Sequence, residues 1–70
     1  MKITSVADLG LLIKEKRNSV NMTQADAAGL CNVGTRFLSD LENGKPTIQF
    51  DKAMYVAKMM GLEVFAEDKK

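Results

Sequence analysis

The sequence has no histidine and a single cysteine among its 70 residues. These absences exclude an internal disulfide and a zinc site built from cysteine and histidine. They also remove the side chain that most often acts as a general base at neutral pH. We therefore expect no metal, no cofactor and no enzymatic activity. The lone Cys31 is interpreted as a small apolar side chain of the core, in a protein of the reducing cytoplasm.

Proline, long apolar runs and net charge are also scarce. The only proline, Pro46, predicts a break between two helices, because it disfavours a helical conformation at the residue before it. No apolar run approaches the ~20 residues of a membrane span, and the N-terminus has no signal-peptide pattern. The formal net charge is +1, which is low for a protein that binds nucleic acid.

Apolar residues at helical spacing make up most of what is present. The hydrophobic fraction of 46% predicts one small globular domain, with little room for a deep catalytic cleft. Four helices are expected, over residues 5–19, 24–31, 34–42 and 48–60. Ser5 and Thr23 are predicted helix caps, since each precedes an aspartate by three residues. Asn21, Asn32 and Gly61 are predicted to turn the chain, because asparagine and glycine tolerate the left-handed conformation.

Residues 62–70 follow a different pattern. Leu62, Val64 and Ala66 alternate with polar residues and Phe65, a period of two that predicts a β-strand. A lone strand leaves backbone groups unpaired, and this chain offers no convincing second strand. We therefore predict that the strand pairs with its copy across a two-fold axis, which makes these four residues a dimerisation element. Fraying or a short fifth helix is the alternative.

Residues 23–44 meet the conditions for two short helices that cross at close range around a tight turn. A small residue is needed where the helices touch, and Ala28 supplies it. The turn needs a residue that accepts a positive φ, and Asn32 can do so. The inner faces need apolar side chains, here Ala27, Cys31, Val33, Leu38 and Leu41.

These residues carry a family resemblance. The run TQADAA at 23–28 and the run DLENGK at 40–45 resemble the Cro/repressor-type (XRE-like) helix-turn-helix family. The run RFLSDLENGKPT at 36–47, followed by MGLEV at 60–64, is most similar to HipB-type antitoxins. The resemblance covers residues 9–64. It implies an all-α, compact four- to five-helix lambda-repressor-like domain, with the short C-terminal β-strand pairing across a dimer.

The resemblance also implies a division of the chain and a set of DNA contacts. Residues 1–61 would form the DNA-binding domain, with a helix-turn-helix unit at 23–44 and a recognition helix at 34–42 that enters the major groove. Arg36 is the best base reader, because its planar fork matches two acceptors of guanine. The base-reading set is Gly34, Thr35, Arg36, Ser39 and Asp40, and the phosphate-binding set is Thr23, Gln24, Asn43 and Lys45.

A structural ion pair between Arg17 and Glu42 is implied in the same way, partly buried and fixing the attitude of the recognition helix. The unit at 23–45 carries three acidic and two basic residues, a net charge of −1, and Arg17 would neutralise one of the acids. Two placements stay open for Phe37, against the loop at Pro46 or beside a DNA sugar.

The function that follows is a dimeric, sequence-specific transcriptional regulator that binds a two-fold symmetric DNA operator. The antitoxin resemblance implies autorepression and a HipA-type serine/threonine kinase toxin as a second partner. A phage-type repressor without a toxin partner is one alternative. A protein-interaction module that does not bind DNA is the other.

Overall fold

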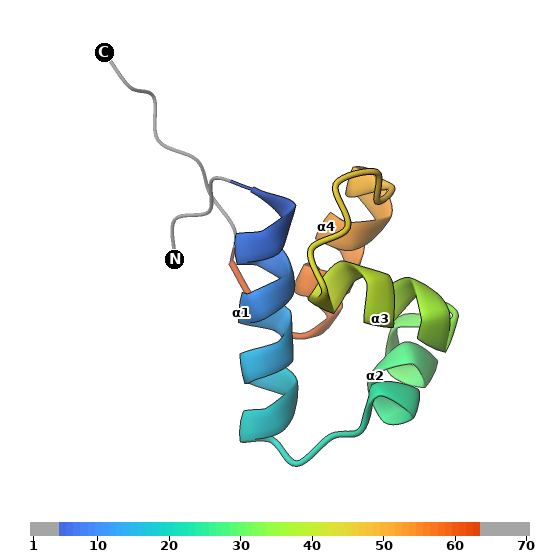
Figure 1. Ribbon diagram of the computed structural model, residues 1–70. Coiled ribbons are helices and arrows are strands. Elements are labelled where there is room, and N and C mark those ends of the chain that lie inside the picture. Colours follow the sequence, from blue (N-terminus) through green and yellow to red (C-terminus); the bar gives the residue numbers. More distant parts are fainter. Residues whose placement is uncertain (1–4, 64–70) are drawn as a thin grey trace.

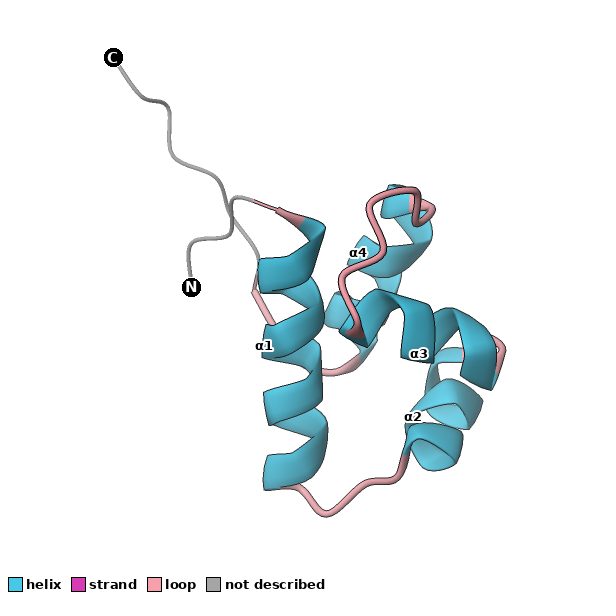
Figure 2. Ribbon diagram, in the orientation of Figure 1, coloured by secondary structure: helices cyan, strands magenta, loops and turns pink. Residues whose placement is uncertain are grey.

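The computed structural model describes residues 5–63, which form four α-helices joined by short loops (Figures 1 and 2). They are α1 (Val6–Ser19), α2 (Gln24–Cys31), α3 (Thr35–Glu42) and α4 (Phe50–Met59). The predicted all-α architecture is confirmed for this part of the chain. Two starts differ from the prediction, because Gly34 is the N-cap of α3 and Gln49 is the N-cap of α4.

Side-chain caps set the starts of the first two helices. The Ser5 hydroxyl accepts a hydrogen bond from the Asp8 amide at 3.2 Å. Thr23 and Asp26 form a reciprocal capping box, in which the Asp26 amide donates to the Thr23 hydroxyl at 3.0 Å and the Thr23 amide donates to the Asp26 carboxylate at 3.2 Å. Each bond satisfies an amide that the helix itself leaves unpaired. Both predicted caps are therefore confirmed.

Residues with a positive φ lie where the helices end and the chain turns. Asn21 has φ 57° between α1 and α2, and Asn32 has φ 55° between α2 and α3. Gly61, with φ 78°, follows α4. These are the three turn positions that the sequence predicts, and each is occupied by a residue type that adopts this conformation at low strain.

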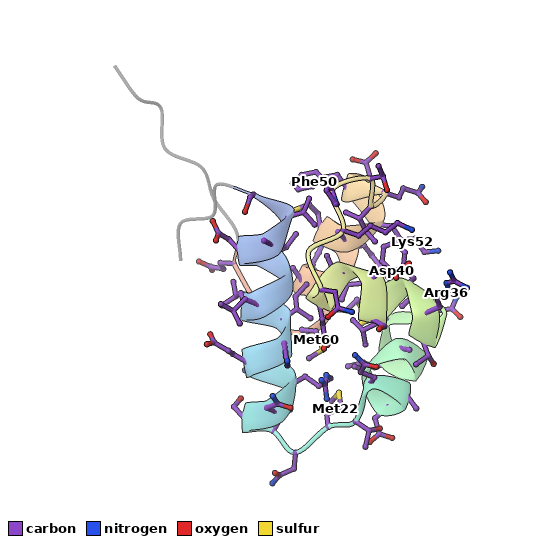
Figure 3. The ribbon with its side chains drawn as sticks, viewed as in Figure 1. Met22, Arg36, Asp40, Phe50, Lys52 and Met60 are labelled. Carbon is purple, nitrogen blue, oxygen red and sulfur yellow. The ribbon has the colours of Figure 1, made fainter. Side chains whose placement is uncertain are left out.

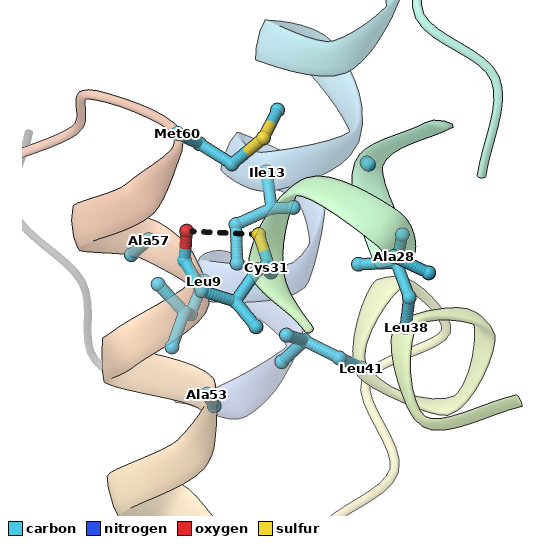
Figure 4. Close-up of a cluster of buried hydrophobic side chains, with 11 residues drawn as sticks. Leu9, Ile13, Ala28, Cys31, Leu38, Leu41, Ala53, Ala57 and Met60 are labelled. Atoms are coloured by element: carbon cyan, nitrogen blue, oxygen red, sulfur yellow. Dashed lines mark hydrogen bonds between the residues drawn. The ribbon is translucent and has the colours of Figure 1, made fainter. Parts of the chain in front are cut away.

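The core lies between the four helices and draws on all of them (Figure 4). Its buried residues are Leu9, Ile13, Ala27, Ala28, Cys31, Leu38, Leu41, Ala53, Val56, Ala57 and Met60. Ala28, the small residue predicted where α2 and α3 touch, is buried in this core. Val33 packs against the edge of this core and is partly buried, which agrees with its predicted place on the inner face.

Cys31 is part of this core. Its thiol contacts the backbone carbonyl oxygen of Val56 at 4.0 Å, and burial raises the pKa of the thiol. A raised pKa disfavours the nucleophilic thiolate, which agrees with a packing role.

The contact between α1 and α3 depends on a glycine that the sequence analysis did not single out. Gly10 is buried in the middle of α1, and a Cβ atom added there would overlap the backbone carbonyl oxygen of Leu41. The absence of a side chain therefore lets α3 lie directly against α1. This close approach fixes the C-terminal half of α3.

The predicted C-terminal strand falls mostly beyond the residues that the structure describes. Leu62 and Glu63 belong to neither a helix nor a strand. Val64, Phe65 and Ala66 lie outside residues 5–63, so their strand and its pairing stay predictions. Within the described range, none of the helices is both long enough and apolar enough to cross a membrane.

Candidate nucleic-acid interface

The N-terminal half of α3 is exposed at the surface of the helix-turn-helix unit. α3 turns Leu38 and Leu41 into the core, which leaves the opposite face of the helix at the surface. Among the predicted base readers, Gly34, Thr35 and Arg36 are exposed, and Ser39 and Asp40 are half-buried. Figure 3 shows Arg36 at the outer end of α3 and Asp40 further along the same helix.

Arg36 has the hydrogen-bond donors and the solvent exposure that a base-reading side chain needs. Its guanidinium offers a planar set of N–H donors, and the structure records no ion pair for it among residues 5–63. The helix places it one residue inside the N-terminus of α3, on the side away from the core. Its donors therefore point to solvent, where an acceptor on a ligand can reach them.

Arg17 and Glu42 meet at the other end of α3. The Arg17 Nε donates to Glu42 Oε2 at 2.8 Å and the Arg17 Nη2 donates to Glu42 Oε1 at 2.9 Å, a two-pronged geometry. The third nitrogen, Nη1, donates to the backbone carbonyl of Met22 at 2.9 Å. The side chains are 12% and 3% exposed, so this pair is shielded from the solvent screening that weakens surface ion pairs.

The pKa values of the pair move in the directions expected of a formed ion pair. The hydrogen bond to Glu42 raises the pKa of Arg17 against the opposing effect of burial. Burial by itself would raise the pKa of Glu42, but the hydrogen bonds from Arg17 and Gln24, together with the positive charges of Arg17 and Lys14, outweigh it and hold that pKa below its usual value. Both groups therefore stay charged.

Gln24 joins the same cluster, although the sequence analysis assigned it to phosphate binding alone. Its Nε2 donates to Glu42 Oε1 at 3.1 Å, so α1, α2 and α3 each contribute one side chain to a single polar network. Gln24 is half-buried there. No local signal predicts this contact, because 18 positions of sequence separate the two residues.

The remaining predicted phosphate contacts lie at the two ends of the helix-turn-helix unit. Thr23 is exposed at the start of α2, where its hydroxyl caps the helix. Asn43 and Lys45 are exposed directly after α3. Lys45 Nζ lies 3.6 Å from Asp40 Oδ2, which brings one predicted phosphate contact beside one predicted base reader.

A family model described as helix-turn-helix matches residues 13–64, most of the chain. The protein belongs to the helix-turn-helix family. It is also similar to an uncharacterised HTH-type transcriptional regulator, y4mF, of Sinorhizobium fredii (strain NBRC 101917 / NGR234). The two are 40% identical over 63 residues, which cover 90% of this chain and 83% of the relative. The resemblance seen in the sequence is confirmed at this level, and its antitoxin subtype stays a prediction.

The structure also places a cation beside α3 that the sequence analysis missed. Lys52, in the first turn of α4, holds its Nζ 4.8 Å from the centre of the Phe37 ring. The ring is half-buried, and the contact with Lys52 leaves open both placements predicted for it, against the loop at Pro46 or beside a DNA sugar. The helix-turn-helix unit alone gives no sign of this contact, since α4 follows the unit in sequence.

Proposed function

We propose that this protein is a dimeric, sequence-specific DNA-binding regulator of transcription that inserts α3 into the major groove. The observation that carries the proposal is the contrast along α3. Its N-terminal half is exposed around Arg36, which has no recorded ion pair among residues 5–63, while its C-terminal end is held by Arg17 and Glu42. A helix held at one end and open at the other suits the docking geometry of recognition helices. The similarity to an HTH-type transcriptional regulator supports the same function.

Base reading is assigned to the exposed face of α3. Arg36 would donate two hydrogen bonds to guanine, and Thr35 would contact a base or a thymine methyl group. Ser39 would bond a base or phosphate. Asp40 would accept a hydrogen bond from cytosine, and Lys45, at 3.6 Å, would offset its repulsion by phosphates. Gly34 lets the helix terminus approach the base edges, because it has no side chain and a Cβ there would meet open space.

Backbone binding is assigned to the residues that flank α3. At the start of α2 the capping box already uses the amides of Thr23 and Asp26, so a phosphate would be met there by the two amides between them. Within residues 5–63 the side chain of Gln24 has one recorded hydrogen bond, to Glu42, so its second N–H could still contact a phosphate. Asn43 and Lys45 would contact the opposite strand. These contacts position the protein and carry no sequence information.

Dimerisation is the second part of the proposal. Tyr55 and Met59 of α4 are 46% and 39% exposed, and the half-buried Leu62 follows them in the chain. An apolar surface beside the predicted strand would gain from burial against a second copy. Two copies would also double the phosphate contacts, which a chain of net charge +1 needs for firm binding.

The direct test is selection of duplexes from a randomised library by the full-length protein, followed by fluorescence anisotropy on the enriched duplex. We expect saturable binding that weakens steeply with salt and a preference for two-fold symmetric sites. Light scattering should give the mass of a dimer. A library in which no sequence is enriched would leave the protein-interaction alternative and reject DNA recognition.

The antitoxin role extends this proposal to a second partner. A HipA-type kinase would bind a surface away from α3, and the exposed apolar residues Leu11 and Leu30 are candidates for such contacts. The test is co-expression with a kinase-like reading frame next to the gene, followed by co-purification. Failure to co-purify would favour the phage-type repressor without a toxin partner.

A further inference from the structure

Lys52 of α4 lies against α3 although it is not part of the helix-turn-helix unit. We propose that Lys52 is a DNA-phosphate contact, held in place beside the recognition helix by the ring of Phe37. The inference rests on the proposed function, since it names one more residue of the same interface. It is carried by the 4.8 Å separation of the Lys52 Nζ from the ring centre.

The position of the ring decides where the ammonium lies. Phe37 follows Arg36 in α3, so a cation over its ring lies next to the exposed N-terminal half of that helix (Figure 3). The groove walls on both sides of an inserted helix are lined by phosphates. An ammonium group on the flank of α3 would therefore lie close to a DNA phosphate when the helix occupies the groove.

The ring holds the ammonium without using up its charge. A cation over an aromatic face is attracted by the electron-rich ring, and the ring remains neutral. Lysine has three N–H donors, so contact with the ring on one side leaves donors for a phosphate oxygen. In the described part of the chain, Lys52 has no recorded carboxylate partner. Lys45 differs, because Asp40 lies 3.6 Å from it.

The charge balance of the interface gives an independent reason for such a residue. Residues 23–45 carry a net charge of −1, and pairing with Arg17 brings the unit only to neutrality. A neutral surface gains little from counterion release when it meets DNA. Lys52 adds a positive charge from outside the unit, next to the helix that must approach the phosphates.

The test is fluorescence anisotropy of the full-length protein on the duplex that wild-type protein enriches, over a series of KCl concentrations. For Lys52→Gln we expect binding about 5- to 10-fold weaker near 0.1 M salt, and a salt slope smaller by about 0.9 for each bound protomer. The weakening should be equal on the enriched duplex and on a scrambled one, because a phosphate contact is blind to sequence. Lys52→Arg keeps both charge and ring contact and should keep the slope.

Two further variants separate this role from a structural one. Lys58→Gln removes the same charge from an exposed position in the last turn of α4, and it should leave the slope unchanged. Phe37→Leu keeps Lys52 but removes the ring, and it should weaken binding less than Lys52→Gln does. Thermal melting of each variant is the control that tests whether it is folded at the assay temperature.

The outcomes distinguish this inference from the function on which it rests. Wild-type binding with an unchanged slope in Lys52→Gln would overturn the phosphate contact and leave DNA recognition intact. Unchanged affinity in Phe37→Leu would remove the ring from the proposal. No enriched duplex for the wild-type protein would reject the proposed function itself.

Discussion

The two arginines beside α3 have opposite surroundings. Arg17 uses all three of its nitrogens in bonds to Glu42 and Met22, and its side chain is 12% exposed. Arg36 is exposed and has no recorded ion pair within residues 5–63. One arginine thus holds the C-terminal end of α3, while another, at the N-terminal end, remains available to bind a ligand. The comparison teaches that partners, rather than residue type, separate a structural arginine from a binding one.

The largest expected effect is the loss of the buried arginine. Arg17→Ala leaves Glu42 charged and shielded from water without its main partner, which should lower the free energy of unfolding by about 3–5 kcal/mol. For a domain of this size, each kcal/mol corresponds to a drop in Tm of roughly 4–8 °C. Thermal denaturation followed by circular dichroism measures the change. A Tm equal to that of the wild type would show that the pair does not stabilise the fold.

Replacing the exposed Arg36 should affect DNA recognition and leave stability nearly unchanged. Arg36→Ala is expected to change stability by no more than about 0.5 kcal/mol. It should reduce discrimination between the enriched duplex and one with a single base pair changed by about 1–3 kcal/mol. Arg36→Lys is the matched control, because it keeps the charge and loses the planar fork. Full sequence preference in Arg36→Ala would discard the base-reading assignment.

Gln24 tests whether the buried network extends beyond the ion pair. Gln24→Ala removes the 3.1 Å bond to Glu42 but leaves the Arg17 fork, so unfolding should become easier by about 1 kcal/mol. Urea denaturation gives the value. Ala25, exposed at the next position of α2, provides a matched control as Ala25→Gln. Equal stability of Gln24→Ala and wild type would confine the network to two residues.

The smallest effect should appear as a pH dependence. The pKa of Glu42 is lower in the folded protein than its usual value of 4.5, so the unfolded chain binds this proton more readily. The stabilisation is fully present above that unfolded value and is lost as the pH falls through the folded pKa. The difference in unfolding free energy between wild type and Glu42→Gln should therefore shrink with acidification. A difference that stays constant down to acid pH would contradict the lowered pKa.

Local signals predicted most of the fold. The caps at Ser5 and Thr23 and the turns at Asn21 and Asn32 depend on neighbours in the chain, and each was found where expected. The spacing of apolar residues predicted which face of each helix is buried, because that spacing also depends only on near neighbours in the chain. Within the site, the exposure of Arg36 followed from the burial of Leu38 and Leu41 on the other face of α3.

The pairings around the recognition helix were harder to predict. The contact between Arg17 and Glu42 came from the family resemblance and not from spacing. The bond from Gln24 to Glu42, the place of Lys52 over Phe37 and the close approach at Gly10 were missed. Each of these contacts joins two different helices, and the spacing of residues within one helix does not predict which residues of another helix it meets.

The sequence by itself determined the helices, the caps of the first two and the side of each that faces inward, because these depend on residues within one or two turns. The tertiary structure decided which charged and polar side chains meet, and so which arginine holds α3 and which lies exposed at the surface. Such meetings depend on how α1 and α2 pack against both α3 and α4, and that arrangement is set only when the apolar core packs.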